Sequence, residues 1–348
     1  GRINQFVVGI VVVKMSFKLE TVSDVELLEK AQYYDTKNFH RIHHGPRLDI
    51  PISDRWGSRP FFLPARHKSS MELIENFSVR PDDTWVISYP KTGSTWTQEM
   101  VWQIANNLNF SKARNISIHD RFPFFEVGSI AAINSNEESL KYLQDMPSPR
   151  FIQTHLPAPL LPKEVWIVKP KIIYVTRNAK DTALSFYHFY RNVQDYRGTL
   201  RDLVDAFLAD ATNYAPFDAH VIDFWNMRDE ENILFITYEE MKRDLPSVID
   251  KTAKFFGKSF TNDQINILAE HLSFDKMSKN DSVNFKQRIE DIPKCVNPKK
   301  DKDFSFMRKG KIGSYREEMT PDMIQVFNGW IKRRVSENGD PELLNILL

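Results

Sequence analysis

The sequence predicts a single α/β domain built around a central parallel β-sheet that is flanked by helices. Three observations support this class: four short runs rich in β-branched and aromatic residues, helix-length amphipathic segments between or after them, and no repeat or interdomain linker. Short buried strands that alternate with helices are typical of β-α-β crossovers, which keep the strands parallel. The chain has 348 residues, 41% of them hydrophobic, and is therefore long enough to bury a sizeable core.

The expected elements follow one another along the chain. The strands are expected at Thr84–Tyr89, Arg150–His155, Lys171–Thr176 and Asn232–Tyr238. The helices are expected at Thr95–Leu108, Asp181–Tyr190, Leu200–Ala211 and Phe217–Arg228. Residues 40–70 contain prolines, glycines and little periodicity, and are expected to be an extended segment that wraps the core. Within it, His40, His43 and His44 have no acidic or cysteine partner nearby, so a solvated loop is favoured over a metal site.

Residues 1–14 are expected to be a non-native leader, with Met15 as the natural start of a single domain over residues 15–348. The apolar run Phe6–Val13 is too short to span a bilayer, and no small-residue cleavage site follows it. Cys295 is the one cysteine, which excludes an intrachain disulfide and favours a free thiol in a cytoplasmic protein. The net charge is +1, so no overall basic field attracts nucleic acid or a membrane.

The segment Pro90–Thr95 connects the first expected strand to a helix through small and hydroxyl residues. This arrangement directs backbone N–H groups and a helix N-terminus at one point, as in many phosphate or sulfate sites. Lys91 adds a positive charge, and Ser94 and Thr95 add hydroxyl donors. The pattern is not a Walker A loop, because Lys91 precedes the only glycine, Gly93. On this motif alone, an ordinary strand-to-helix turn is an equally good interpretation.

Two further groups follow the second and third strands. His155 ends the second strand, and a neutral imidazole suits removal of a hydroxyl proton near neutral pH. In isolation, a packed core histidine is the favoured interpretation. Arg177 ends the third strand and Ser185 lies in the next helix, so a phosphate could accept from both. Because the carboxyl ends of parallel strands meet at one edge of the sheet, Lys91, His155 and Arg177 are expected to lie close together.

The segment Phe306–Gly313 is a third basic group, interrupted by two glycines. Such a run is usually a solvated loop, but glycine between Arg and Lys can also lie flat on a phosphate. Seven Lys and Arg residues occur between Lys294 and Lys311, against two aspartates, so the local field attracts anions. Two anion sites and one base at one sheet edge indicate a nucleotide-like donor with phosphates at both ends.

Five motifs, in their order along the chain, resemble the cytosolic sulfotransferase family, which includes insect-type members. They are YPKTGSTW (89–96), THLP (154–157), YVTRNAKDTALSFYHFY (174–190), TYEEMKRD (237–244) and FMRKGKIG (306–313). The resemblance covers the chain from about residue 40 to the end. It implies a single α/β domain with a P-loop-like loop that binds phosphosulfate. It also implies the donor 3′-phosphoadenosine-5′-phosphosulfate (PAPS), with adenosine 3′,5′-bisphosphate (PAP) as the product.

The resemblance assigns the donor-binding residues one by one. The 5′-phosphosulfate would be held by Lys91, Thr92, Gly93, Ser94 and Thr95. The 3′-phosphate would be held by Arg177, Ser185, Arg308, Lys309 and Gly310. Adenine would be contacted by Trp96, Tyr238 and Phe274.

The resemblance also implies in-line displacement at sulfur without a metal. The catalytic residues would be His155, Lys91 and Ser185, with His155 as the general base and Lys91 as the group that stabilises the leaving phosphate. Phe124 and His155 would contact the acceptor, a small and fairly apolar phenol, alcohol, steroid or retinoid. The segment Phe122–Phe125 is expected to be mobile and to close over the acceptor.

Three positions depart from the family pattern. Gln153 stands where the family often has a lysine, and Leu272 where a threonine often contacts adenine. The dimer motif of the family is degenerate in Arg316–Gln325, which keeps only Thr320, so a homodimer through this segment stays open.

Three alternatives to simple sulfuryl transfer stay open. Some relatives form a sulfate ester only transiently and release a dehydrated product, as in an insect enzyme that acts on retinol. Gln153 leaves room for a non-catalytic nucleotide-binding relative, although Lys91 and His155 oppose it. A nucleotide kinase is disfavoured because the Walker A lysine and a clear acidic Mg²⁺ motif are missing.

Overall fold

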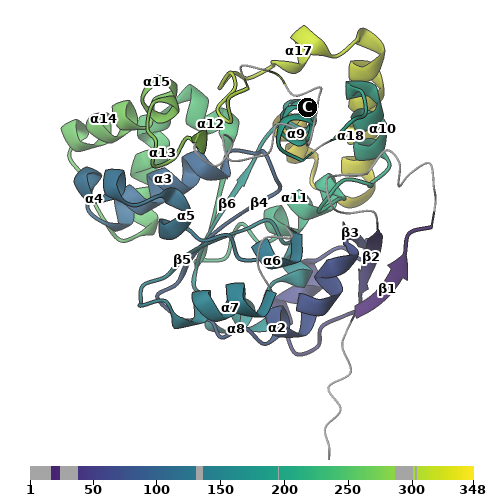
Figure 1. Cartoon of the computed structure of the whole chain (residues 1–348), viewed down its shortest axis with the longest axis horizontal. Helices are drawn as coiled ribbons and strands as arrows, with labels where there is room; N and C mark the ends of the chain where they lie inside the picture. The colour runs from purple at the N-terminus through teal and green to yellow at the C-terminus, as the bar shows by residue number, and fades with distance from the viewer. Residues whose placement is uncertain (1–16, 24–37, 131–135, 195, 287–300, 302–303) are drawn as a thin grey trace, which may run out of the picture.

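The computed structural model describes residues 17–23, 38–130, 136–194, 196–286, 301 and 304–348. Its longer helices surround a four-stranded sheet (Figure 1). The helices are α2 Met71–Glu75, α3 Ser94–Ala105, α4 Phe110–Asn115, α5 Ile118–Arg121, α6 Val127–Ile130, α7 Asn136–Asp145, α8 Lys163–Val168, α9 Ala179–Val193, α10 Leu200–Leu208, α11 Phe217–Asn226, α12 Tyr238–Arg243, α13 Leu245–Phe255, α14 Asn262–His271, α15 Phe274–Ser278, α17 Tyr315–Glu318, α18 Pro321–Asn338 and α19 Leu344–Leu347. Short 3₁₀ segments are η1 Pro51–Arg55, η2 Ala65–Ser70, η3 Ala158–Leu160 and η4 Pro341–Leu343.

The central sheet has the strand order β5-β4-β6-β7, and all of its neighbouring strands run parallel. Its strands are β4 Thr84–Ser88, β5 Phe151–Thr154, β6 Lys171–Thr176 and β7 Ile233–Thr237. The predicted α/β class with a central parallel sheet is therefore confirmed, and the four predicted strands and four predicted helices are present with no end shifted by more than three residues. The single domain over residues 15–348 stays a prediction. Residues 1–14, the run Phe6–Val13 and Cys295 lie outside the described residues.

A second sheet corrects the expectation for residues 40–70. Strands β1 Phe17–Thr21, β2 Phe39–His44 and β3 Phe61–Pro64 pair antiparallel in that order. The expected solvated loop with three histidines is therefore wrong, because His40, His43 and His44 all belong to β2. His43 Nε2 lies 2.8 Å from Glu20 Oε2 on the neighbouring strand. In FHRIHH the apolar residues Phe39 and Ile42 are three apart, so the alternation typical of a strand is missing, and the strand depends on pairing with distant partners.

Helices cover both faces of the central sheet because successive side chains of a strand point in opposite directions. Trp85 and Ile87 of β4 pack on one side, within the cluster that also contains buried residues of α9, α10, α11 and α18. Val86 lies on the other side with Ile173 and Val175 of β6, against α3, α13 and α14. Figure 1 shows α2, α7 and α8, which precede the strands, together at the bottom of the view. The segments that follow the strands lead to the opposite end, where the chemistry was expected.

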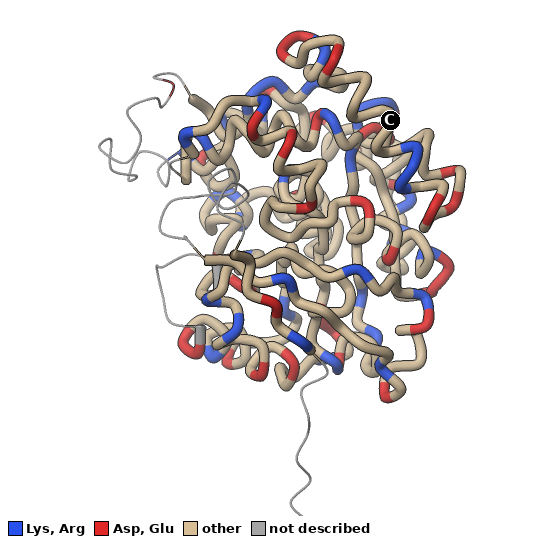
Figure 2. Tube along the Cα trace, turned by 90° about the vertical axis from the view of Figure 1, so that its right-hand side faces the viewer, with Lys and Arg blue, Asp and Glu red and all other residues tan. Residues whose placement is uncertain are grey.

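Basic and acidic residues are interspersed along the trace, as expected for a net charge of +1 (Figure 2). Among the described residues, no helix combines the length and apolar character that a membrane span requires. Thr320, the residue retained from the family's dimer motif, is the N-cap of α18 and accepts a hydrogen bond from the backbone N–H of Met323.

A buried ion pair ties together the starts of β4 and β5. Arg150 Nε and Nη2 donate to the two carboxylate oxygens of Asp83 over 2.8 and 2.6 Å, and both side chains are fully buried. The remaining donors of Arg150 bond the backbone carbonyls of Leu143 and Ser78. Since Asp83 directly precedes β4 and Arg150 directly precedes β5, the pair fixes the register of the two strands whose far ends carry Lys91 and His155.

Asp83→Ala is expected to lower the free energy of unfolding by about 3–5 kcal/mol, because it leaves the Arg150 charge buried without its partner. Lys141→Ala is the control: it removes the exposed ion pair with Asp145 and should leave the free energy of unfolding almost unchanged. Urea unfolding followed by tryptophan fluorescence measures both. Equal, small losses in the two variants would contradict an anchoring role for the buried pair.

Candidate active site

The loop between β4 and α3 has a backbone that only particular residues adopt. Lys91 has φ 71° and Gly93 has φ 109°, both in the left-handed region. A Cβ atom at position 93 would lie 2.9 Å from Cδ2 of Tyr238, so the close approach of this ring also requires glycine. The Thr92 hydroxyl is buried and bonds the carbonyl oxygens of Tyr89 and Val175, which holds the loop to β6. Thr92 can therefore bind an anion only through its backbone N–H.

The N-terminus of α3 is open to an anion. Gly93 is its N-cap and supplies no side-chain acceptor, and the first turn contains no acidic residue. By contrast, α9, α10, α12 and α14 begin with Asn or Thr side chains that accept the first N–H groups. Uncapped N–H groups at a helix N-terminus favour a phosphate or sulfate. Ser94 and Thr95, in the first turn, add hydroxyl groups at this point.

Lys91 lies close to two other cations, Arg177 and Arg308, and, unlike them, has no carboxylate partner among the described residues. Its Nζ is 4.3 Å from the ring centre of Phe189 and 4.0 Å from that of Phe306. Burial, together with the charges of Arg177 and Arg308, lowers the pKa of Lys91 to about 7. No described carboxylate forms an ion pair with Lys91, so a bound anion would restore its charge.

The imidazole of His155 is held in one tautomer. Its Nδ1 lies 2.7 Å from the carbonyl oxygen of Ser88, which can only accept, so Nδ1 carries the proton. Nε2 then has the lone pair, and the side-chain amide of Gln153 donates to it over 3.0 Å. Burial, with smaller contributions from the nearby His220 and Lys91, lowers the pKa of His155 to about 3, although the hydrogen bond to Ser88 opposes the shift. The ring is therefore neutral at neutral pH and has an acceptor at Nε2.

The backbone of His155 is clamped on both sides. Its N–H donates to Glu126 over 2.8 Å, and its carbonyl oxygen accepts from His220 Nε2 over 2.9 Å. Glu126 also accepts from Thr154 Oγ1 and from the hydroxyl of Tyr214. Burial raises the pKa of Glu126 to about 7, although these three hydrogen bonds oppose the rise. The carboxyl group thus fixes the end of β5, and neither Glu126 nor Tyr214 was singled out by the sequence patterns.

Closure of the Phe122–Phe125 segment over the acceptor stays a prediction, and in the structure most of this segment is packed. Phe122 and Phe125 are buried in the two core clusters. Phe124 forms a parallel bridge with Gln153, which extends the sheet beyond β5. The Phe124 ring packs edge-on against His155 with 5.4 Å between ring centres, so the predicted proximity of these two residues is present.

An aromatic group lies beside the loop on the side away from His155. Trp96 and Tyr238 contact each other with 5.4 Å between ring centres, and Arg177 lies over the Tyr238 ring at 4.3 Å. Phe274 is 41% exposed and borders Gly310, where a Cβ atom would overlap its ring. The side chain of Leu272 is buried in the core, and its backbone carbonyl oxygen accepts a hydrogen bond from the indole N–H of Trp96. Because this contact uses the backbone, it does not require a particular side chain at position 272.

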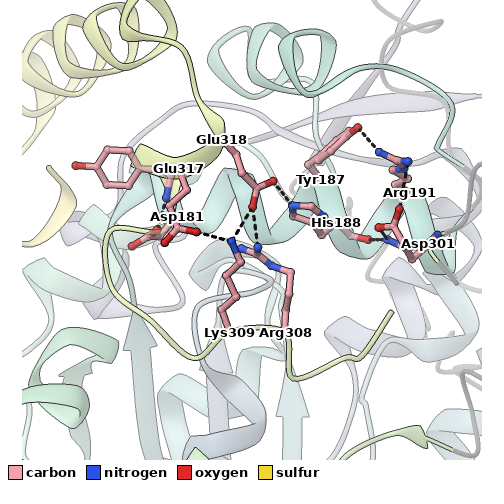
Figure 3. Close-up of polar contacts among 11 residues, drawn as sticks. Asp181, Tyr187, His188, Arg191, Asp301, Arg308, Lys309, Glu317 and Glu318 are labelled. Carbon is pink, nitrogen blue, oxygen red and sulfur yellow. Dashed lines mark hydrogen bonds and ion pairs between the residues drawn. The ribbon is translucent and has the colours of Figure 1, made fainter. Parts of the chain in front are cut away.

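The basic loop is attached to α9 and to α17 by carboxylates. Asp181, in the first turn of α9, accepts from the backbone N–H groups of Gly313 and Tyr315. Arg308 donates to Glu318 over 2.8 Å, and Lys309 lies 2.6 Å from Glu317 and 3.4 Å from Glu318 (Figure 3).

His188 contacts the same carboxylate from the other side. Its Nε2 lies 2.6 Å from Glu318 Oε2, as Figure 3 shows. The sequence patterns gave no indication of this contact. Burial lowers the pKa of His188, and Glu318 opposes that shift. Glu318 therefore receives hydrogen bonds from Arg308, Lys309 and His188.

The structure brings most of the predicted residues to one edge of the sheet. Lys91, His155 and Arg177 follow β4, β5 and β6, and Arg308 approaches them from the C-terminal part of the chain. Ser185 is half-buried on α9, and its hydroxyl has no hydrogen bond to a described residue. The sequence patterns missed the contacting residues Phe189, Phe306, Glu126 and Glu318, since each meets the site through a contact between distant segments.

Comparison with known proteins agrees with this geometry. The family model described as "Sulfotransferase domain" matches residues 81–339. The luciferin sulfotransferase of Photinus pyralis is 40% identical over 280 residues, which cover 76% of this chain and 75% of that protein. Sulfotransferase 1 family member D1 of Mus musculus is 35% identical over 81% of this chain and 92% of its own length.

A solved structure of retinol dehydratase in complex with androsterone and PAP is 25% identical to this chain, with a TM-score of 0.79. The similarity covers 94% of this chain and 98% of that structure. With three cations and an uncapped helix at the carboxyl edge of the sheet, the chain belongs to the cytosolic sulfotransferase family and is an enzyme that uses PAPS as its donor.

Proposed function

We propose that this enzyme transfers the sulfuryl group of PAPS to a hydroxyl of a small, fairly apolar acceptor, with His155 as the general base. The observation that carries the proposal is the tautomer of His155. Because Nδ1–H is bound to the carbonyl oxygen of Ser88, the lone pair is on Nε2. This atom lies on the side of the ring where Gln153 and Phe124 are in contact with it, and an acceptor hydroxyl would bind there. A neutral imidazole in this orientation can take the proton of a hydroxyl.

The residues at the loop fit the two charged ends of PAPS. Lys91 and the N–H groups at the start of α3 would hold the 5′-phosphosulfate, with the hydroxyls of Ser94 and Thr95. When bound, PAPS supplies the sulfuryl group and the phosphate that leaves. Lys91 would stabilise the negative charge that develops on the leaving phosphate oxygen. Its environment supports this role, because no described carboxylate forms an ion pair with Lys91 itself.

The second phosphate would lie between Arg177, Ser185 and the Arg308–Gly310 segment. Arg177 is 9% exposed, and its Nε has no partner among the described residues, as an anion-binding guanidinium requires. Trp96, Tyr238 and the exposed Phe274 would contact the adenine ring between the two phosphates. We place this enzyme in the cytoplasm, as the single cysteine of the chain suggests.

The acceptor class follows from the rings around His155. Phe124 and Tyr214 pack edge-on against the imidazole with 5.4 and 5.6 Å between ring centres, so the acceptor meets an apolar surface. The similar proteins carry names that fit such an acceptor, luciferin in one and androsterone in another. Dehydration through a transient sulfate ester is the second candidate, because retinol dehydratase structures resemble this chain over more than nine tenths of its length.

The product of the reaction tests the proposal. With labelled PAPS and a panel of phenols, steroids, catecholamines and retinol, the wild type is expected to give a sulfate ester of added sulfuryl mass. His155→Ala should lower the rate by about 10²–10⁴-fold while PAP binding persists, because the hydroxyl proton has no acceptor. His43→Ala, on β2, is the control. A dehydrated product without ester would favour the second candidate, and full activity of His155→Ala would remove the base assignment.

PAP binding is expected to take up a proton at pH 8. Lys91 has a pKa of about 7 in the ligand-free protein, so it is largely neutral at pH 8, and a bound phosphate raises that pKa. The affinity for PAP should therefore fall as the pH rises above 7. Titration calorimetry in two buffers of different ionisation enthalpy measures the uptake, and Lys91→Arg, charged throughout, should abolish it. Identical heats in both buffers for the wild type would contradict the prediction.

Glu318→Gln is expected to tighten PAP binding by about two- to fivefold, because it removes a carboxylate that neutralises Arg308 and Lys309. Asp145→Asn, exposed on α7, makes the same change of charge away from the loop and should have no effect. The dissociation constant of PAP at low salt measures both. Weaker binding in Glu318→Gln would show instead that Glu318 orients Arg308 toward the phosphate.

A further inference from the structure

We propose that Gln153 is a positioning residue for the reaction: its side-chain amide holds the lone pair of His155 Nε2 toward the acceptor and is displaced by the acceptor hydroxyl. The inference rests on the proposed role of His155 as the base. It assigns a specific task to a residue that the sequence patterns marked only as a departure from the family.

The orientation of the Gln153 amide follows from the hydrogen bonds of the ring. Because Ser88 offers a carbonyl oxygen, His155 Nδ1 must carry the proton and Nε2 must be the acceptor. The group 3.0 Å from Nε2 must then be a donor, which assigns the NH₂ of Gln153 to that position rather than its carbonyl oxygen. Both nitrogens of the ring thus have a partner from the protein, and the plane of the ring is fixed.

The backbone of Gln153 is equally constrained. Its N–H donates to the carbonyl oxygen of Pro123 over 3.0 Å, and its carbonyl oxygen accepts from the N–H of Phe125 over 2.8 Å. On its other side it pairs in register with Val86 of β4. Residues two apart in a strand share a face, so the side chain of Gln153 lies beside His155, and it is 8% exposed. A donor delivered from such a rigid strand has little freedom to turn elsewhere.

The contact has two consequences for the reaction. The lone pair of Nε2 accepts one strong hydrogen bond, so an acceptor hydroxyl reaches it only by replacing the amide of Gln153. The amide donor at His155 Nε2 also favours the neutral ring over the protonated one. In imidazolium, Nε2 would carry a proton, and its N–H would point at the N–H of the Gln153 amide. In the empty site Gln153 therefore keeps His155 neutral and correctly turned.

The other titratable groups around the ring stay the same when only residue 153 changes. Lys91 on the phosphate loop and His220 on α11 disfavour a charged imidazole. Glu126 binds the backbone N–H of His155, and Tyr214 packs on the ring through its edge. If the pKa of His155 changes when residue 153 is substituted, the change can therefore be attributed to the contact between these two side chains.

Gln153→Glu reverses the contact, because a carboxylate accepts where the amide donates and requires a proton on Nε2. The pKa that limits kcat/KM at acid pH is expected to rise by at least about one unit. At a pH below that pKa, kcat/KM should then be about tenfold lower than in the wild type. Gln153→Met keeps the length of the side chain without a donor. It is expected to lower the acceptor KM by about two- to tenfold, since no hydrogen bond must be displaced, and to lower kcat because the ring turns more freely.

Imidazole ¹⁵N and ¹H NMR of the PAP-free protein supplies a readout that does not depend on turnover. His155, assigned by comparison with His155→Ala, should titrate at a higher pH in Gln153→Glu than in the wild type. PAP affinity and the unfolding temperature should be unchanged, and Gln144→Glu on α7 is the matched control for the added charge.

These measurements separate the two proposals. Two results together would overturn the role of Gln153. In folded Gln153→Glu, the acid limb of kcat/KM and the NMR titration of His155 would both be unchanged. In Gln153→Met, kcat and KM would change by a common factor or not at all. If Gln153→Glu does not fold, the KM and kcat of Gln153→Met decide alone. Should His155→Ala keep its activity while the NMR titration shifts as expected, the base assignment fails and the contact between the two side chains stands.

Discussion

The parallel pairing of β4 with β5 and β6 is the constraint on which the whole site depends. It brings the carboxyl ends of three strands to one edge, and with them Lys91, His155 and Arg177. The pairing is anchored at the opposite end, where Arg150 and Asp83 form a buried bidentate ion pair before the first residues of β5 and β4. The chemistry at one end of the sheet thus depends on a charge interaction at the other, about a strand's length away.

The cations at this edge of the sheet differ in whether they already have a carboxylate partner. Lys91 has no carboxylate partner among the described residues, and the cations around it favour an anion at the loop. The Arg308–Lys309 pair, by contrast, already has the carboxylates of Glu317 and Glu318 as counter-ions. One end of the proposed donor site is therefore open to a phosphate, whereas at the other end a bound phosphate would replace carboxylates of the protein. This difference follows from placement, since the chain as a whole is almost neutral.

The orientation of His155, the proposed base, depends on hydrogen bonds more than on charge. Burial keeps His155 neutral, and the carbonyl oxygen of Ser88 decides which nitrogen has the lone pair. Glu126 and His220 hold its backbone through hydrogen bonds. Phe124, the proposed acceptor contact beside the ring, is joined to the sheet through its bridge with Gln153.

The local elements and the candidate anion and base residues could be predicted from the sequence: alternating strands and helices, Lys91 and Gly93 in a loop, and His155 at a strand end. These depend on residues close together in the chain, where spacing and side-chain type are sufficient evidence. Which groups meet could not be predicted in this way. The second sheet, the Glu318 counter-ion and the tautomer of His155 depend on contacts between segments separated by ten to more than a hundred residues, or on backbone atoms, and neither is visible in a local pattern.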